Sequence, residues 1–157
     1  MHCTKRAYEP IDSIKAGDIC IIKEEPCIVH YAEYVRGRGS GRGSMHGPKY
    51  IKRISGTSII SEKIIEEESK PTYVKDSCLL KFQLSDEDVY LLLDIDSNYQ
   101  CSVVLESNTI LDFQVKLPAN NIGKQLLKAF TDEDFDIMVT ILTWDGKSQI
   151  ISYKIKM

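Results

Sequence analysis

The stretch NNIGKQLLKAF (residues 120–130) has a helical pattern, and strand-like runs lie on both sides of it. Its apolar residues recur four apart and so share one helix face: Ile122, Leu126 and Phe130. Asn120 or Asn121 can cap the first turn, because a short polar side chain accepts a hydrogen bond from the unpaired N–H groups there. The pattern predicts a short amphipathic helix, which Gly123 weakens a little.

Strand patterns precede and follow this helix. The runs are 89–95, 100–105 and 109–117 before it, and 135–144 and 148–155 after it. The last two flank Asp145-Gly146, a dipeptide typical of β-hairpins because glycine adopts positive φ at little cost. Three strands, a helix and two strands are the order of the OB-fold, a five-stranded barrel, although other small barrels share such an order. We expect residues 85–157 to form an OB-fold domain.

The first half of the chain contains only short strand patterns. They are 18–23, 26–35, 49–54, 57–65 and 72–82. Glu24, Glu25 and Pro26 are expected to form the first turn, and EEESKP (66–71) an exposed loop. Short strands without a helix favour a small SH3-like barrel. With a boundary at the polar SDED (85–88), the predicted fold is all-β: an N-terminal SH3-like barrel (1–84) followed by a C-terminal OB-fold barrel with one short helix.

A bare basic loop interrupts the first half. RGRGSGRGSMHGPKY (36–50) contains five glycines and four basic residues and no acid. Between residues 36 and 53 every charged side chain is basic, and these are the candidate RNA-binding residues: Arg36, Arg38, Arg42, Lys49, Lys52 and Arg53. Arginine suits phosphate because its planar fork donates two parallel hydrogen bonds, and Arg-Gly repeats recur in segments that engage RNA. The alternative is a disordered insertion that happens to be basic.

The charge of the chain is unevenly distributed. Residues 1–84 hold 14 basic and 11 acidic side chains, whereas residues 85–157 hold 6 basic and 12 acidic ones. The net charge of −3 therefore conceals a concentrated positive field in the first half. Such a field attracts polyanions even when the whole protein is acidic.

The sequence indicates a cytoplasmic protein with no membrane partner. No apolar run approaches the roughly 20 residues that cross a bilayer. The N-terminus lacks the apolar core of a secretory signal, and the terminal KIKM matches no lipidation or retention signal. The five cysteines are odd in number and none stands in a C-x-x-C spacing, so a disulfide framework is not expected. We expect Cys20, Cys27 and Cys101 to be buried, reduced thiols.

Catalytic motifs are missing from the sequence, which predicts no enzyme activity, no cofactor and no small-molecule substrate. Asp94 and Asp96 could act as an acid–base pair, but the polar end of a strand that leads into a turn is the favoured interpretation. His30 is expected to be a packed or half-exposed strand residue and not a base. His2 and Cys3 could bind a metal through the chain end, although no metal site is predicted.

Four stretches together resemble a known family: AGDICIIKEEPCIV (16–29), YLLLDID (90–96), VKLPANNIGKQLLKAF (115–130) and DIMVTIL (136–142). Each is similar to the corresponding stretch of translation initiation factor 5A of eukaryotes and archaea. The first includes the Pro-Cys of that family at residues 26 and 27. The similarity follows the same order and spacing over nearly the whole chain. It implies the same fold, a small barrel with a basic hairpin followed by an OB-fold.

The resemblance also implies a function. Members of this family bind the ribosome and extend the loop toward the peptidyl-transferase centre, where it meets ribosomal RNA and steadies peptidyl-tRNA. They relieve stalling, notably at runs of proline, and assist termination, without a catalytic residue of their own. A lysine at the loop tip is converted to hypusine with spermidine. The implied partner is therefore the ribosome; a weak homodimer is left open.

The loop tip departs from the family pattern Thr-Gly-Lys-His-Gly-His-Ala-Lys, because this chain has SGRGSMHGPK (40–49). The modified lysine aligns with Arg42, Ser44 or Met45, depending on which neighbour anchors the alignment. None of these has the primary amine that the modification needs, so hypusine is not expected here. Lys49 fits the downstream lysine of the family. The loop residues carried over with the tip are Gly41, Gly43, His46 and Gly47.

Three functional interpretations follow from this departure. In the first, the chain is a translation factor, and Arg42 supplies fixed charge at the tip, as in bacterial elongation factor P of lineages with arginine there. In the second, it is a diverged paralogue with a structural, self-assembling role similar to the Woronin-body protein of filamentous fungi. In the third, it is an RNA-binding module that acts away from the ribosome.

Overall fold

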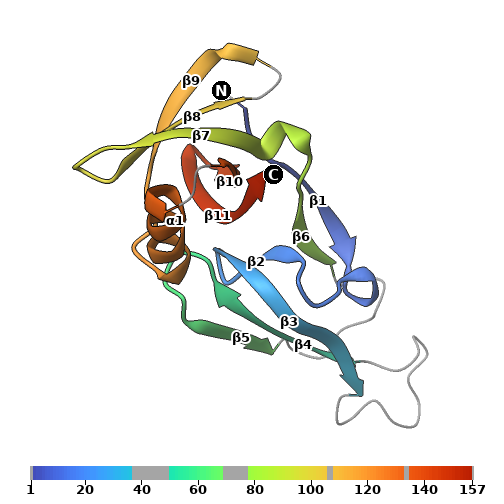
Figure 1. Ribbon diagram of the computed structural model, residues 1–157. Coiled ribbons are helices and arrows are strands. Elements are labelled where there is room, and N and C mark those ends of the chain that lie inside the picture. The colour runs from blue at the N-terminus through green and yellow to red at the C-terminus, as the bar shows by residue number, and fades with distance from the viewer. Residues whose placement is uncertain (1, 37–49, 69–77, 106–107, 133–134, 157) are drawn as a thin grey trace, which may run out of the picture. The chain divides into compact units, whose positions relative to one another are not determined.

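The computed structural model describes residues 2–36, 50–68, 78–105, 108–132 and 135–156. Two compact units divide the chain: Arg6–Gln83 forms one, and Met1–Lys5 joins Leu84–Met157 in the other. The sequence placed the division between residues 84 and 85, so the structure differs in assigning the first five residues to the second unit. Each unit is built on one antiparallel sheet, which confirms the all-β fold (Figure 1).

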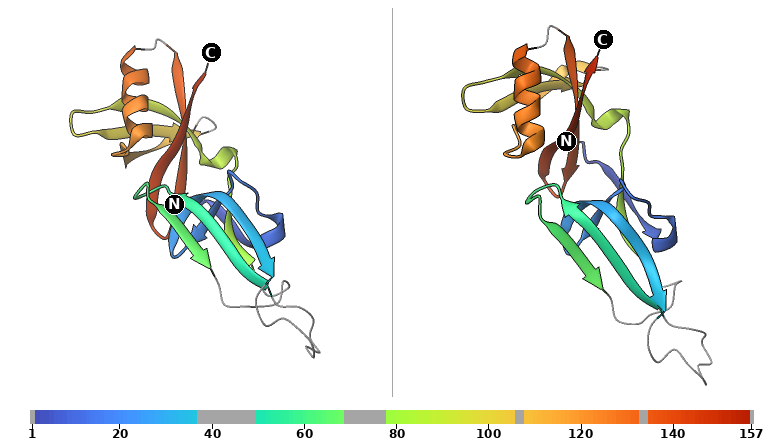
Figure 2. Two further views of the ribbon diagram at one scale, coloured as in Figure 1. Left: turned by 90° about the horizontal axis from the view of Figure 1, so that it is seen from below. Right: turned by 60° about the horizontal axis from the view of Figure 1, so that its bottom comes forward.

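The first unit contains a six-stranded sheet in the order β1-β6-β2-β3-β4-β5. The strands are β1 (Lys5–Pro10), β2 (Ile19–Ile22), β3 (Glu25–Arg36), β4 (Tyr50–Ser58), β5 (Ile64–Glu68) and β6 (Cys78–Gln83), and a 3-10 turn, η1 (Ile11–Ser13), follows β1. Its core consists of buried side chains from these strands and from η1, among them Ile11, Ile22, Val29 and Ile54. Figure 2 shows β3 and β4 side by side to their ends at Arg36 and Tyr50.

The prediction of separate strands at 49–54 and 57–65 is wrong. A single strand, β4, runs from Tyr50 to Ser58, and its Gly56 pairs with Val29 of β3. A Cβ atom at Gly56 would lie 2.9 Å from the carbonyl oxygen of Ile28 and 3.0 Å from Cδ1 of Ile22. This glycine therefore serves close packing within a strand and does not end it.

Two further boundaries differ from the sequence prediction. The acidic run expected as an exposed loop at 66–71 supplies Glu66, Glu67 and Glu68 to β5. The first turn is formed by Lys23 and Glu24, both at positive φ, whereas Glu25 already belongs to β3. At both boundaries, charged residues that suggest a turn or a loop belong to a strand instead.

The second unit has the predicted OB-fold order. Its elements are a 3-10 turn η3 (Asp86–Asp88), β7 (Val89–Ile95), β8 (Gln100–Leu105), β9 (Asn108–Lys116), α1 (Asn121–Asp132), β10 (Asp136–Trp144) and β11 (Lys147–Lys156). The sheet order is β11-β10-β7-β8-β9, and β11 also contacts β9, which brings the two edges together as a barrel requires. The Asp145-Gly146 turn joins β10 to β11 as predicted, with Trp144 opposite Lys147.

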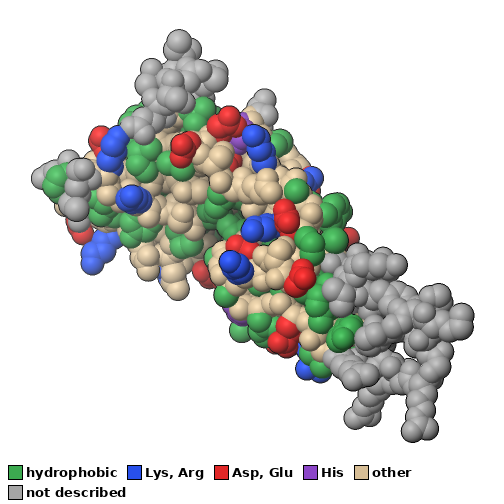
Figure 3. All heavy atoms as spheres, turned by 90° about the vertical axis from the view of Figure 1, so that its right-hand side faces the viewer, with side chains coloured by type: hydrophobic (Ala, Val, Ile, Leu, Met, Phe, Trp, Pro, Cys, Tyr) green, Lys and Arg blue, Asp and Glu red, His purple; other side chains and the backbone are tan. Residues whose placement is uncertain are grey.

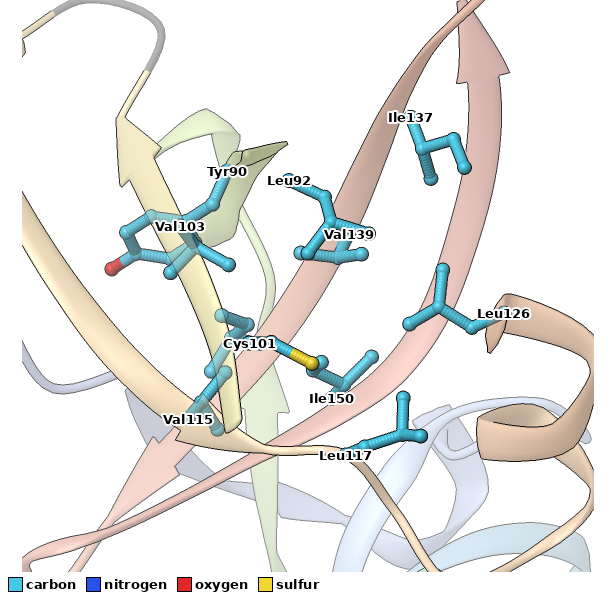
Figure 4. Close-up of a cluster of buried hydrophobic side chains, with 11 residues drawn as sticks. Tyr90, Leu92, Cys101, Val103, Val115, Leu117, Leu126, Ile137, Val139 and Ile150 are labelled. Atoms are coloured by element: carbon cyan, nitrogen blue, oxygen red, sulfur yellow. The ribbon is translucent and has the colours of Figure 1, made fainter. Parts of the chain in front are cut away.

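The helix α1 closes the core of this unit. Leu126 is fully buried and points toward Ile137 and Ile150 of the last two strands (Figure 4). Asn120 caps the helix, since its Oδ1 accepts a hydrogen bond of 3.1 Å from the backbone N–H of Gly123. The sequence left Asn120 and Asn121 open as caps, and the structure selects Asn120.

The N-terminal residues attach to the second unit through a buried carboxylate. Thr4 donates its backbone N–H to the Thr143 carbonyl (2.9 Å) and accepts the Thr143 N–H at Oγ1 (2.9 Å). The same hydroxyl donates to Oδ1 of Asp88 (2.9 Å), and His2 Nε2 lies 2.8 Å from that oxygen. Because Asp88 is fully buried, these contacts and the Ser85 N–H (2.9 Å) supply the partners that a buried carboxylate needs.

Candidate nucleic-acid interface

Three of the six predicted RNA-binding residues lie on the β3–β4 hairpin. The two strands pair from Cys27↔Ser58 to Arg36↔Tyr50, with one irregularity where His30 has no register partner. Arg36 therefore ends β3, and Lys52 and Arg53 lie within β4. Further predicted positions lie outside the described residues: Arg38, Gly41, Arg42, Gly43, Ser44, Met45, His46, Gly47 and Lys49.

Acidic side chains flank Arg53. Its Nε lies 3.7 Å from Oε2 of Glu68 on β5, and Glu33 is its register partner on β3. Both partners of the ion pair are about half exposed, so solvent weakens it. The arginine nevertheless has two carboxylates beside it, which offset its charge toward an anionic ligand. Arg53 is thus less suited to phosphate than an arginine without acidic neighbours.

Two tyrosines that the sequence analysis did not select lie among the basic residues. Tyr34 is the register partner of Lys52, and Tyr50 is the register partner of Arg36. Their rings meet edge to face, with centroids 6.2 Å apart and an interplanar angle of 61°. The signal was present in the sequence, since tyrosines lie on each side of the glycine-rich loop, but their meeting depends on the register of the strands.

A polar hollow of about 490 Å³ lies beside this hairpin. It is lined by Lys23, Tyr31, Arg53, Ile54 and the glutamates Glu66, Glu67 and Glu68. Basic and acidic side chains share this lining, and they are also interspersed over the described surface shown in Figure 3. Outside residues 36–53, the first 84 residues hold 8 basic and 11 acidic side chains, so the segment 36–53 carries the excess of positive charge in this half of the chain.

The candidate acid–base residues have structural roles. Asp96 caps the turn between β7 and β8, because its Oδ1 accepts from the N–H groups of Asn98 (2.8 Å) and Gln100 (2.9 Å). This supports the turn interpretation of the Asp94 and Asp96 pair. His30 contacts the Thr57 hydroxyl through Nε2 (2.7 Å) and the Ser55 hydroxyl through Nδ1 (3.4 Å). These two contacts hold the His30 imidazole against β4.

The three cysteines that were predicted to be buried, Cys20, Cys27 and Cys101, are buried and free. Burial raises the pKa of Cys20 to about 12, with a smaller contribution from Asp18. Burial likewise raises the pKa of Cys27 and of Cys101 to about 11. The thiolate is the nucleophilic form, so these groups stay unreactive near neutral pH. Cys20 and Cys27 are register partners in β2 and β3.

Metal-binding and membrane-spanning features were also sought in the described parts of the chain. There, no three His, Cys, Asp or Glu side chains lie together in a way that could hold a metal ion. His2, a metal candidate by sequence, contacts Asp88 instead. No described helix is long and apolar enough to cross a membrane.

Comparison with known proteins gives consistent similarities. The family model described as "Eukaryotic elongation factor 5A hypusine, DNA-binding OB fold" matches residues 86–154. The curated eukaryotic translation initiation factors 5A-1 and 5A-2 of Saccharomyces cerevisiae are each 29% identical over 143 residues, which cover 90% of this chain and 81% of theirs.

Solved structures resemble the chain over nearly its full length. A translation initiation factor eif-5a family protein from Naegleria fowleri matches with a TM-score of 0.62 and 21% identity, over 98% of this chain and 99% of that one. Eukaryotic translation initiation factor 5A from Methanococcus jannaschii matches with a TM-score of 0.56 and 15% identity, over 96% and 92%. At these identities the two structures support the fold alone.

Proposed function

We propose that the chain is a member of the translation initiation factor 5A family and that it binds the ribosome with its basic loop directed at peptidyl-tRNA. In this proposal it acts in the cytoplasm during elongation and termination, and it is not an enzyme. The loop steadies the acceptor end of peptidyl-tRNA near the peptidyl-transferase centre. Arginine guanidinium groups provide the charge that a hypusine side chain provides in relatives.

One observation carries the proposal: every charged residue from 36 to 53 is basic, and this segment joins two long paired strands. The register of β3 and β4 holds up to Arg36 and Tyr50, so the hairpin provides a firm stem for the segment between them. A cationic segment on a firm stem is suited to a target that is folded RNA, because phosphate binding there is electrostatic.

The absence of hypusine is part of the same proposal. Residues 37–48 contain no lysine, and the modification needs a primary amine. Arg42, Ser44 and Met45 are the positions that align with the modified residue, and none can be its substrate. Intact-mass spectrometry of the protein from its native cells should give the unmodified mass, and a mass increase confined to Lys49 would contradict this part.

Ribosome co-sedimentation tests the contact itself. We expect binding that weakens steeply with salt, because phosphate contacts release counterions. Replacing Arg36, Arg38 and Arg42 with alanine should abolish it. The matched control replaces Lys124, Lys128 and Lys154 with alanine. These lysines are exposed in the second unit, and their replacement removes the same amount of charge.

The outcomes of this experiment separate the proposed function from its alternatives. Binding that is lost in the arginine variant and kept in the lysine variant supports the loop as the contact. Unchanged sedimentation of the arginine variant would overturn it. Large oligomers that form without ribosomes and independently of the loop would instead support a self-assembling structural protein.

A further inference from the structure

The outer end of the β3–β4 hairpin lies beyond the strands that flank it. In the described residues, pairing of β4 with β5 ends at Arg53↔Glu68, and pairing of β3 with β2 ends at Ile28. The last pairs of the hairpin are Tyr34↔Lys52, Val35↔Ile51 and Arg36↔Tyr50. These three pairs form a two-stranded end beside which no third described strand pairs.

The tyrosines share one side of this end. Directly opposed residues point to the same face, so Tyr34 and Lys52 lie together, and the edge-to-face contact places Tyr50 beside Tyr34. Tyr34 packs against the core of the first unit, which fixes its ring. Tyr50 and Lys52 are half exposed, and Tyr50 is not part of that core. The result is a supported aromatic ring at the protein surface with a cation beside it.

We propose that Tyr34, Tyr50 and Lys52 form a stacking face for an unpaired RNA nucleotide. An aromatic ring next to a cation is the arrangement that binds single-stranded nucleic acid: the base stacks on the ring, and the cation meets its phosphate. Glu33 and Glu68 pair with Arg53 and so point to the opposite face. Glu67 pairs with Ile54, which shares the face of Lys52, so it is the acid in register closest to the stacking face. The basic segment 36–53 is complementary in charge to a phosphate backbone, which favours RNA over a protein as the partner of this face.

This inference rests on the proposed function and adds to it, because it names what the stem contacts. The segment 36–53 supplies electrostatic attraction that any phosphate backbone satisfies. The stacking face selects nucleotides whose bases are not paired, since only these expose a free ring surface. The protein should therefore prefer unpaired RNA over duplex RNA, which charge alone does not explain.

The test measures binding of the full chain to a short oligouridine RNA and to a duplex RNA of equal charge, by fluorescence anisotropy. Tyr50→Ile removes the ring and keeps a residue that favours strands, so it should weaken oligouridine binding by about 5- to 100-fold. Its slope of affinity against salt should stay unchanged, because no phosphate contact is lost. Tyr50→Trp keeps an aromatic ring and should bind at least as tightly as the wild type.

Two controls make the result specific. Tyr8→Ile changes an exposed tyrosine of the same unit and should leave binding within about twofold of the wild type. Lys52→Gln should lower the salt slope by about one, as expected for one lost phosphate contact. Tyr34 is left intact in these variants because it packs on the core.

The inference is overturned if Tyr50→Ile binds oligouridine like the wild type, or if the wild type prefers the duplex. Should Tyr50→Ile fail to fold, weaker binding of the folded Tyr50→Trp than of the wild type would overturn it as well. Salt-sensitive ribosome binding by the same preparation keeps the proposed function intact in each of these cases. Loss of ribosome binding in the wild type would instead refute the proposed function.

Discussion

Gly123 lies in the first turn of α1, where the helix passes the backbone of Pro118. A Cβ atom there would overlap the Pro118 carbonyl oxygen and lie 2.8 Å from its carbonyl carbon. Helix propensity alone favours alanine over glycine by about 1 kcal/mol in a helix. Contact with the rigid backbone should reverse that sign, since neither the helix nor Pro118 can move freely.

We therefore expect Gly123→Ala to lower the free energy of unfolding of the second unit by about 1–3 kcal/mol. Urea unfolding followed by the fluorescence of Trp144, the single tryptophan and a buried residue of this unit, gives the measurement. Gln125→Ala, at an exposed position of the same helix, is the control and should change stability by less than about 0.5 kcal/mol. A stabilised Gly123→Ala would contradict the packing described for this turn.

The buried thiols predict a second result at the scale of single residues. Burial holds the pKa of Cys20, Cys27 and Cys101 at about 12, 11 and 11, above the ordinary value of 9.0. The unfolded chain therefore loses these protons first as pH rises above 9, so their contribution to stability falls from there toward the folded-state pKa values. Below pH 9 both states keep the protons and the contribution is constant.

Thiol labelling should accordingly separate the cysteines into two groups. Near pH 8, roughly where free thiols begin to ionise, only the exposed Cys3 and Cys78 should react rapidly in the native protein. All five should react after unfolding in denaturant. Rapid native labelling of Cys20, Cys27 or Cys101, identified by peptide mass, would show that these strands open far more often than their burial implies.

At the scale of elements, two hairpin turns both need residues at positive φ but use different residue types. The β10–β11 turn uses Asp145-Gly146 at φ 47° and 76°, whereas the β2–β3 turn uses Lys23-Glu24 at φ 47° and 69°. Positive φ costs a residue with a Cβ roughly 1–2 kcal/mol, and glycine avoids that cost. The β2–β3 turn is thus a strained version of the other.

Glu24→Gly should consequently stabilise the first unit by about 0.5–1 kcal/mol. Thermal unfolding followed by far-ultraviolet circular dichroism measures the change. Gly146→Ala is the converse control: nothing lies within 4 Å of the added methyl group, so any loss of stability there comes from backbone strain. If Glu24→Gly is neutral or destabilising, the side chain of Glu24 contributes more than the strain costs.

Element boundaries in the second unit were predictable because each had a local cause. A capping asparagine, an Asp-Gly turn and strands with alternating burial such as β7 and β8 fixed the order and most ends within a residue or two. In the first unit the local signals misled. Gly56 resembles a strand end but makes room for Ile22 and Ile28, and Glu66–Glu68 resembles a loop but pairs along β4. The sequence analysis also missed β1, because its charged residues resemble a loop.

The candidate site was predictable only in part. Composition located the basic residues, and the structure places Lys52 and Arg53 on β4 next to the end of the hairpin. Composition could not show that Glu68 and Glu33 flank Arg53, or that Tyr34 and Tyr50 meet, because both facts depend on strand register. Side chains that are far apart in sequence became neighbours only through pairing.

At the scale of the whole molecule, charge and fold are divided in similar ways. The half of the chain with the SH3-like unit contains the uninterrupted basic segment, whereas residues 85–157 have twice as many acidic as basic residues. An acidic OB-fold is poorly suited to contact phosphate over its surface, so we expect the proposed RNA contact at the hairpin. The central claim is therefore that this hairpin, with arginine in place of hypusine, acts on the ribosome.

The most direct test expresses this protein in cells depleted of their own translation initiation factor 5A and measures ribosome stalling at runs of proline. The account predicts that the wild-type protein relieves stalling without modification, and that the variant with alanine at residues 36, 38 and 42 does not. Equal amounts of folded wild-type protein that leave stalling unchanged would contradict the claim, as would full relief by the alanine variant.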